Sequence, residues 1–464
     1  MAVSKRERGA SLILFTMITA VVLIPIVGLA VDGAVLFWEK ARLSASVDAA
    51  ALATGRALNT SQALTTQLST IEQIGQNYFL ANFQPGQMGT SVVTPTANLV
   101  SIDASQLNVI TVTVQATVSV PLYFMRLFGT PTASVSDTGK AQRRDLNVIF
   151  VIDRSGSMNT GTECSDLRNA ITDSLNYFID GRDTLGLITF QYSAALDWGP
   201  AKTFISGSPS MVSKVNQLYC YGATNSSMAL SMAHSQITAL NGQSKLNVVI
   251  FFTDGYPTAL NIGSTADPVT IASSSSCNAS DVLAGVVTMP GQSPNDSGPT
   301  YGLYVSTPMN ISSSTDPSIA ARTGCSFNTN SQNMWKDVAY LPAHDAYGNL
   351  TDNGYQPFGA DSRIYNSGGH LRSDYQSSVL YAAFNTADAA GQSIRTDSTY
   401  SPIIYTIGLG SSVDTDFLKR LANDPSYSNY NSSLAKGQYV YASDSSQLDS
   451  AFREIASMVL KLSQ

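Results

Sequence analysis

The protein has 464 residues, of which 44% are hydrophobic and only 13% are charged, about half of the usual share. This length predicts two or three domains, and a low charge with many Ser, Thr, Asn and Gly residues favours an exported protein over a cytosolic enzyme. The net charge of −7 without a basic stripe argues against a nucleic-acid partner, because phosphates are neutralised by clustered Lys and Arg.

The first 59 residues predict a membrane anchor. Residues 10–31 carry no charge, and a helix of that length crosses a hydrocarbon core of about 30 Å. Basic residues precede this span and acidic residues follow it, which predicts a cytoplasmic N-terminus and an extracytoplasmic remainder. These flanking residues are Lys5, Arg6, Arg8, Asp32 and Glu39. A cleaved signal peptide is the alternative, but the span exceeds the roughly 7–15 apolar residues of such a segment.

Strong helix formers over 38–55 predict that the helix continues beyond the span. Arg8-Gly9-Ala10, Gly28-Leu-Ala-Val-Asp32 and Ala45-Ser-Val-Asp-Ala-Ala-Ala-Leu-Ala53 together resemble the N-terminus of TadE/TadG-like proteins. These are components of the tight-adherence (Flp) pilus machinery. The resemblance implies a single-pass protein of the inner (cytoplasmic) membrane with a periplasmic head; a generic alanine-rich membrane helix is the alternative.

One feature departs from pilins. Type IV-like prepilins are cut after a Gly and carry Glu at the fifth mature position, whereas the fifth residue after Gly9 is Leu14. We therefore expect an anchored protein and not a polymerised pilin.

Residues 60–144 predict a small α+β spacer. A helix is expected over 61–83, followed by segments in which apolar and polar residues alternate, as in half-buried antiparallel strands. These segments are 91–103, 107–120 and 132–141. The apolar segment 121–129 interrupts them; contact with lipid or a partner is one interpretation, and packing in the core is the one that we favour.

The head, residues 145–464, begins with an apolar run that predicts a strand buried on both faces of a parallel sheet. Asp153, Ser155 and Ser157 follow that run, at the end of the strand where open α/β sheets place ligands. A second apolar run, 246–252, leads into Thr253-Asp254-Gly255, so we expect Asp254 at the same sheet edge. Between the two strands, a Gly-led turn before a predicted helix offers Thr224.

These elements, in this order, resemble the von Willebrand factor A domain and its metal-ion-dependent adhesion site. The resemblance implies Ser155, Ser157 and Thr224 as direct metal ligands, and Asp153 and Asp254 as ligands directly or through water. Carboxylates with hydroxyls suit a hard divalent cation, Mg²⁺ first and Mn²⁺ or Ca²⁺ as alternatives. The cation would attract an acidic side chain of a protein partner. The alternative is a serine-rich turn with aspartates that only cap helices.

Further buried strands are expected over 184–190, 403–409 and 439–442, separated or followed by helices, and residues 198–210 are expected to be rich in loops. This alternation predicts a doubly wound, mainly parallel sheet with helices on both faces. Residues from about 258 to 373 break the alternation and are rich in Ser, Thr, Asn, Gly and Pro. Because this insertion leaves the sheet directly after Asp254, we expect it to cover the metal site; a passive insertion is the alternative.

The four cysteines, Cys164, Cys220, Cys277 and Cys325, have no CxxC spacing, which argues against zinc. Of the three pairings that four cysteines allow, we favour Cys164–Cys220 and Cys277–Cys325; reduced thiols are the alternative.

The sequence thus predicts a membrane-anchored, extracytoplasmic binding protein of a tight-adherence pilus or adhesion system, with pilus-assembly components as partners and no small-molecule substrate. A structural assembly factor that acts without metal is the alternative. We do not expect an enzyme. Ser155 or Ser157 as a nucleophile would need a base, the G-x-S-x-G motif is absent, and His234 lies within a helical pattern.

Overall fold

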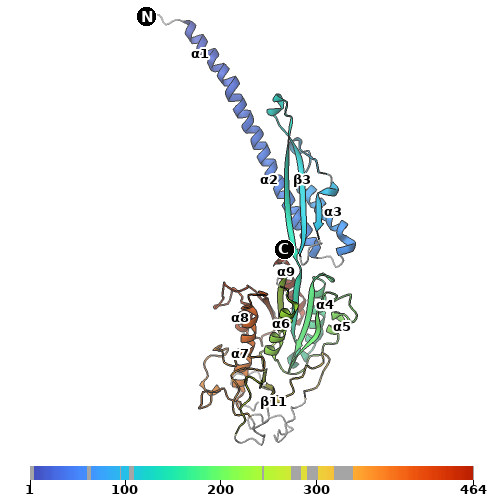
Figure 1. The fold of residues 1–464 in the computed structure, drawn as a ribbon, viewed down its shortest axis with the longest axis vertical. Coiled ribbons are helices and arrows are strands. Elements are labelled where there is room, and N and C mark those ends of the chain that lie inside the picture. Colours follow the sequence, from blue (N-terminus) through green and yellow to red (C-terminus); the bar gives the residue numbers. More distant parts are fainter. Residues whose placement is uncertain are drawn as a thin grey trace. The chain divides into compact units, whose positions relative to one another are not determined.

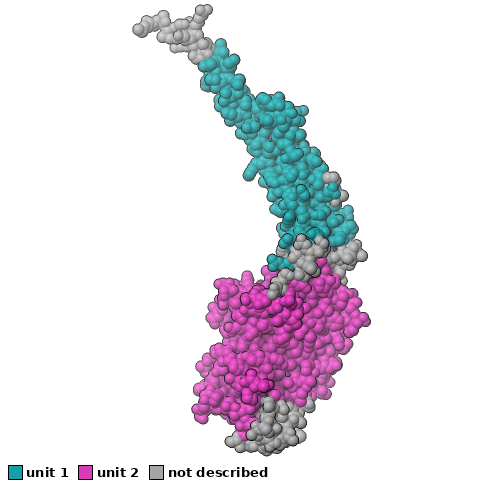
Figure 2. All heavy atoms as spheres, viewed as in Figure 1, with its two compact units in different colours: residues 1–144, 464 teal, residues 145–463 magenta. Residues whose placement is uncertain are grey.

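The computed structural model describes residues 5–59, 64–94, 96–103, 109–242, 245–272, 284–289, 301–317 and 338–462. The chain forms two compact units, residues 1–144 with Gln464 and residues 145–463, which Figure 2 shows in teal and magenta. The division falls between Arg144 and Asp145, where we placed the beginning of the head.

Unit 1 begins with a nearly continuous helix made of α1 (Lys5–Ile18), a π-helical segment (Thr19–Leu23) and α2 (Ile24–Asn59). Within the described residues, it is the one helix that is long and apolar enough to cross a membrane. The side chains of its most apolar stretch are not buried in the structure. The helix also extends beyond the predicted span, as the helix formers over 38–55 indicated.

The rest of unit 1 is helix α3 (Leu64–Asn82) and an antiparallel sheet. Strand β3 (Val109–Pro121) lies in the middle; it pairs with β4 (Thr132–Arg144) on one side and with β1 (Ser91–Val92) and β2 (Val100–Asp103) on the other. The single strand that we expected over 91–103 is therefore two short strands. The sequence explains the break, because Pro95 has no N–H to donate to a ladder.

Alternate residues of β3 are buried against α2, which supplies Leu43, Val47 and Ala50 to the same core. Figure 1 shows α2 running beside β3. The two segments that we expected as separate, 1–59 and 60–144, thus share one hydrophobic core.

Unit 2 is built on a six-stranded sheet in the order β13-β12-β8-β5-β6-β7. All neighbouring strands are parallel except the β6–β7 pair at one edge. The strands are β5 (Leu146–Asp153), β6 (Thr184–Phe190), β7 (Ala194–Ala201), β8 (Leu246–Thr253), β12 (Ile403–Leu409) and β13 (Tyr439–Ala442). The predicted doubly wound, mainly parallel sheet is confirmed.

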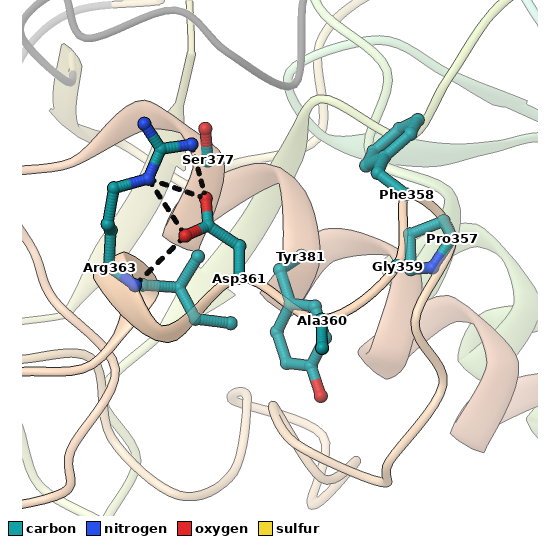
Figure 3. Close-up of a pocket in the computed structure, with 9 residues that line it drawn as sticks. Pro357, Phe358, Gly359, Ala360, Asp361, Arg363, Ser377 and Tyr381 are labelled. Atoms are coloured by element: carbon teal, nitrogen blue, oxygen red, sulfur yellow. Dashed lines mark hydrogen bonds and ion pairs between the residues drawn. The ribbon is translucent and has the colours of Figure 1, made fainter.

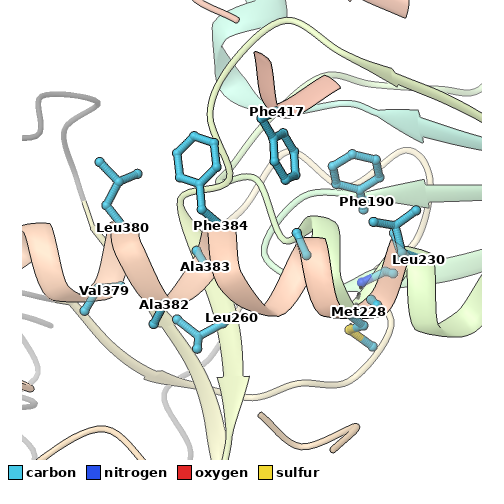
Figure 4. Packing of buried hydrophobic residues seen from close by; sticks show 14 of the residues in the cluster. Phe190, Met228, Leu230, Leu260, Val379, Leu380, Ala382, Ala383, Phe384 and Phe417 are labelled. Carbon is cyan, nitrogen blue, oxygen red and sulfur yellow. Dashed lines mark hydrogen bonds between the residues drawn. The ribbon is translucent and has the colours of Figure 1, made fainter. Parts of the chain in front are cut away.

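Helices cover both faces of this sheet through two separate hydrophobic clusters. One cluster contains α6 (Ser226–Leu240), α7 (Gln376–Arg395) and α8 (Thr415–Ala422); the other contains α4 (Glu163–Leu175), α5 (Met211–Val215) and α9 (Leu448–Leu462). Figure 4 shows the first cluster, where Phe384 of α7 packs edge-on against Phe417 of α8 with ring centroids 5.0 Å apart.

Two sequence predictions for unit 2 were wrong. Residues 198–210 were expected to be a loop, yet β7 continues to Ala201 because a sheet edge tolerates the Gly199-Pro200 pair. The insertion was expected to have no regular pattern, but it contains a small antiparallel sheet of β9 (Ala259–Ile262), β10 (Gly285–Thr288) and β11 (Tyr301–Tyr304).

Candidate metal centre

The carboxyl ends of β5 and β8 lie side by side in the middle of the unit 2 sheet. The chain runs from β5 outward through β6 and β7, then returns to place β8 on the other side of β5. Ligands of open α/β sheets bind at such a reversal of strand order. Asp153 is the last residue of β5 and Asp254 follows β8 directly, so both carboxylates belong to this position.

Hydrogen bonds fix the orientation of the Asp153 carboxylate, which has no solvent exposure. Its Oδ1 accepts a hydrogen bond from the backbone N–H of Ser155 at 2.8 Å. Its Oδ2 accepts a hydrogen bond from the hydroxyl of Thr253 at 2.6 Å. Thr253 is the Thr of the Thr-Asp-Gly sequence, so its role is to tie the end of β8 to the end of β5.

The side chains of Ser155, Ser157 and Asp254 meet directly. The two serine hydroxyls are 3.0 Å apart. Both donate to Oδ1 of Asp254, from Ser157 at 2.8 Å and from Ser155 at 3.3 Å. Three predicted site residues from two different loops thus lie within hydrogen-bonding distance of one another.

The loop that carries Thr224 is bonded to both of the other loops. The carbonyl of Gly222 accepts a hydrogen bond from the N–H of Gly156 at 2.9 Å. The N–H of Thr224 donates to the hydroxyl of Thr258 at 3.0 Å. Gly222 has a φ of 98° and no room for a Cβ atom, which would lie 2.1 Å from Oε1 of Gln191. Only glycine takes this conformation without strain, which explains the Gly that leads the Gly-x-Thr turn.

Hydrogen bonds and the neighbouring charge of Arg154 compensate the two carboxylates of the site only in part. Burial raises the pKa of Asp153, and the nearby charge of Asp254 raises it further. Burial also raises the pKa of Asp254, although hydrogen bonds from Ser157 and Ser155 act in the opposite direction. Neighbouring buried carboxylates resist ionisation together, and a bound divalent cation removes that cost.

The donor set fits a hard cation. No group of three or more His, Cys, Asp or Glu side chains gathers anywhere in the described ranges, so a metal site here depends on hydroxyl as well as carboxylate oxygens. Oxygen-only donors suit Mg²⁺, Mn²⁺ or Ca²⁺ and not zinc. The five residues would supply two carboxylates and three hydroxyls. Their role as ligands stays a prediction.

Arg154 was not singled out from the sequence, although it lies between two predicted ligands. Its side chain is buried, and its Nε donates to the hydroxyl of Thr189 at 3.0 Å. The guanidinium also donates to the carbonyls of Tyr219 at 3.2 Å and of Asn310 at 3.0 Å. Arg154 therefore connects the first site loop to the insertion. The sequence could have indicated this role, because an Arg directly after a buried strand needs polar or charged partners inside the protein.

The described part of the insertion lies against the site loops. The hydroxyl of Tyr192 donates to Asp316 at 2.8 Å, and the hydroxyl of Ser193 donates to the carbonyl of Thr307 at 3.0 Å. Tyr192 also packs on Tyr304 of β11, with ring centroids 5.1 Å apart. The insertion is thus in contact with the loop that follows β6.

A pocket of about 220 Å³, shown in Figure 3, is lined by residues of the insertion and of α7. Phe358 and Tyr381 line it, together with Asp361, whose carboxylate is bonded to Arg363. The ring of Phe358 lies 5.4 Å from that of Tyr256, two residues beyond Asp254. The pocket wall is therefore continuous with the loop that carries Asp254.

Cys164 and Cys220 form a disulfide bond, the pairing that we favoured. It joins the first turn of α4 to the residue before Tyr221, and so links the segments that follow Ser157 and precede Thr224. Cys277 and Cys325 lie outside the described residues.

His234, the histidine considered for catalysis, lies on α6. Its Nε2 is 2.9 Å from Oδ2 of Asp397, which follows α7. This contact attaches the imidazole of α6 to the segment that follows α7.

Two family matches cover different parts of the chain. Residues 148–257 match the von Willebrand factor type A domain, and residues 9–57 match the family described as Flp pilus-assembly TadE/G-like. The chain combines a TadE/G-like N-terminal segment with a von Willebrand factor A domain. The family match of the A domain includes Asp153, Thr224 and Asp254, and it ends where the insertion begins.

Single relatives resemble parts of the chain. Inter-alpha-trypsin inhibitor heavy chain H4 of Homo sapiens is 32% identical over 121 residues, which are 24% of this chain and 12% of that protein. The PilB minor pilin from Streptococcus sanguinis is 14% identical with a TM-score of 0.36, over 81% of this chain and 79% of that one. The vWF domain of the type V pili tip protein Mfa5 from Porphyromonas gingivalis is 14% identical with a TM-score of 0.38, over 69% and 97% of the two chains. The fold assignment of the A domain rests on its strand order and family match.

Proposed function

We propose that this protein is a membrane-anchored, extracytoplasmic binding component of a tight-adherence (Flp) pilus assembly or adhesion system. Its A domain would hold a divalent cation, Mg²⁺ first, and capture an acidic side chain of a protein partner. The TadE/G-like segment supports the pilus context. The apolar helix with its basic residues before and acidic residues after the span supports a cytoplasmic N-terminus and a periplasmic head.

The observation that supports the binding role is that the hydroxyls of Ser155 and Ser157 both donate to one oxygen atom, Oδ1 of Asp254. A serine-rich turn with no ligand would not need two hydroxyls from one loop on a buried carboxylate from another. Asp153 and Thr224 complete the set at the same sheet edge.

A bound cation would supply the positive charge that attracts an anionic group. The protein ligands would determine how much of that charge is left to attract a partner. Ser155, Ser157 and Thr224 would bring uncharged oxygens, so that Asp153 and Asp254 compensate the cation only in part. The buried surroundings of both aspartates exclude water and strengthen the attraction for a partner carboxylate.

Calorimetric titration of Mg²⁺, Mn²⁺ and Ca²⁺ into the full chain in detergent tests this proposal. We expect binding in the micromolar-to-millimolar range, the range of sensor and extracellular cation sites. Asp153→Ala should weaken it by at least about 100-fold. The matched control is Asp416→Ala, which removes an exposed carboxylate from the first turn of α8. Equal binding by the intact chain and by Asp153→Ala would refute the site.

The second candidate, a structural assembly factor that acts without metal, differs in its response to the same variant. It predicts that Asp153→Ala keeps the partner interactions and the pilus phenotype of the intact protein. Loss of cell adhesion or of partner capture by Asp153→Ala, with Asp416→Ala unaffected, would exclude this candidate.

A further inference from the structure

The β3–β4 hairpin of unit 1 ends in a short turn that packs on the apolar helix. The turn contains a 3₁₀-helix, Met125–Phe128, and was expected in the protein core. That expectation was wrong for most of it. Leu122 is buried, but Tyr123, Leu127 and Phe128 are 56%, 78% and 64% exposed. A turn that faces water rarely exposes three large apolar side chains together, so these side chains indicate a contact with another molecule or with a membrane.

Asp32 holds this turn in place. Its carboxylate accepts hydrogen bonds from three consecutive backbone N–H groups, at 2.8 Å from Tyr123, 3.0 Å from Phe124 and 2.8 Å from Met125. These N–H groups stand at the beginning of the 3₁₀-helix, where a carboxylate is favourable. Asp32 is itself the first charged residue after the span 10–31, so the turn is fixed at the level where the apolar span ends.

The Phe124 ring reaches further along the helix, into the span itself. A Cβ atom added to Gly28 would lie 2.2 Å from the ring, so the ring rests directly on the Gly28 backbone. Gly28 precedes Asp32 by four residues, about 6 Å along the helix. Next to it is an apolar groove of about 330 Å³ lined by Phe124 and by Leu23, Ile24 and Val27 of the helix.

We infer that the turn 122–129 inserts into the outer interface of the same bilayer that the N-terminal helix spans. Its occupant is lipid: acyl chains fill the groove beside Phe124 and cover Leu127 and Phe128. The contact between Phe124 and Gly28 favours lipid as the occupant. Gly28 lies within the apolar span, so a ring that packs on Gly28 lies at the same depth in the bilayer. Interfacial elements bury apolar side chains about 5–10 Å deep, which matches this offset. The inference rests on the membrane anchorage in the proposed function.

The expected consequence is a two-point attachment of unit 1. A lone helix leaves the extracytoplasmic part free to rotate and tilt, whereas a second contact beside the helix restricts both motions. Arg126, exposed in the same turn, is suited to the phosphate layer of the interface.

Photo-crosslinking of the full chain in phosphatidylethanolamine/phosphatidylglycerol vesicles tests this inference. p-Benzoylphenylalanine replaces Phe128, with Leu127 as a second position in case the first variant misfolds. Phe15 in the span is the positive control. Tyr78 is the negative control: it is 52% exposed on α3, a helix whose Gly75 packs against Thr54, far along α2 from Asp32. We expect roughly tenfold more lipid adduct from positions 127 and 128 than from position 78, because only side chains inserted into the bilayer meet acyl chains.

The outcomes separate the two proposals. Lipid adducts from Phe15 but only background from Leu127 and Phe128 would overturn the inference and leave the anchor intact. Adducts between two copies of the chain from Phe128 would overturn it in favour of a protein occupant. No lipid adduct even from Phe15 would refute the anchor, and with it the inference.

Discussion

Two aspartates of this chain, Asp32 and Asp153, each follow a long apolar stretch, and the structure treats them differently. Asp32 accepts hydrogen bonds from three consecutive backbone N–H groups, so its charge is compensated by a fixed turn. Asp153 accepts one backbone N–H and one hydroxyl, and a second buried carboxylate, Asp254, lies close enough to raise its pKa. The first aspartate is structurally satisfied, and the second still favours a cation.

This contrast distinguishes a structural carboxylate from one that we propose to bind a cation. The number of donors around the group matters more than its burial, because both side chains are inaccessible in the structure. A carboxylate with a full set of N–H donors gains little from a metal ion, whereas one that faces another carboxylate gains much. The comparison can be tested by substituting each aspartate in turn, because the two substitutions should have different effects.

The largest expected effect is on metal affinity. Asp153→Ala should weaken Mg²⁺ binding by at least about 100-fold, more than the typical loss on removing an outer partner of a metal ligand. Asp32→Ala should leave the affinity unchanged. Titration calorimetry on both variants, with circular dichroism to verify that each is folded, provides the measurement. A comparable loss in Asp32→Ala would remove the distinction between the two carboxylates.

The sequence contained enough information to predict the sheet edge in unit 2 but not the turn in unit 1. Strands β5, β6, β8 and β12 were visible because residues buried on both faces form uninterrupted apolar runs, and Asp153 and Asp254 mark where two of them end. The edge strand β13 was visible from its apolar run alone, although Tyr441 is exposed. Edge strand β7 was missed because Gly199 and Pro200 are typical of loops.

The exposure of Leu127 and Phe128 in unit 1 was missed because an apolar segment of the sequence has the same composition whether it packs in a core or is exposed. The three N–H donors of Asp32 come from residues about ninety positions away, and no local pattern predicts such a contact.

A second prediction concerns the loop that carries Thr224. Gly222→Ala forces a Cβ atom to within 2.1 Å of Gln191 at a φ of 98°, so the loop must shift. We expect a loss of about 1–3 kcal/mol in unfolding free energy and a clearly weaker Mg²⁺ affinity. Gly199→Ala is the matched control, because no atom lies within 4 Å of its added Cβ. Chemical denaturation and calorimetry measure the two effects. Equal behaviour of the two variants would show that the backbone of this loop does not set the site.

A third prediction concerns the turn held by Asp32. Asp32→Ala removes the acceptor of three hydrogen bonds, and bonds to charged groups contribute about 1.5–3 kcal/mol each in favourable cases. Because hydrogen bonds to water replace part of this, we expect local opening of residues 121–129 to become about 10-fold to 100-fold more frequent. Hydrogen exchange of the full chain in detergent measures it through the amides of Tyr123, Phe124 and Met125. Asp137→Ala, which removes an ion pair with Lys40 near the surface, is the control and should change exchange much less.

The smallest expected effect is a pH dependence at Asp197, which accepts a hydrogen bond from Thr189 at the edge of the unit 2 sheet. Burial raises the pKa of Asp197 to about 6, although the hydroxyl of Thr189 and the charge of Arg154 act in the opposite direction. A folded-state pKa above the unfolded value means that this group contributes stability below about pH 4, and that the contribution is lost as the pH rises through 6. Asp197→Asn keeps an acceptor for Thr189 but does not titrate. A pKa raised from 3.8 to about 6 corresponds to about 2 kcal/mol between pH 4 and pH 7.5. Because Asp197 is only partly buried, solvent screening should reduce the rise in the unfolding free energy of Asp197→Asn relative to wild type to about 1 kcal/mol. Urea denaturation at both pH values measures this difference, with Asp416→Asn as the exposed control. If the difference in unfolding free energy between Asp197→Asn and wild type stays constant with pH, the pKa of Asp197 is not raised in the folded state.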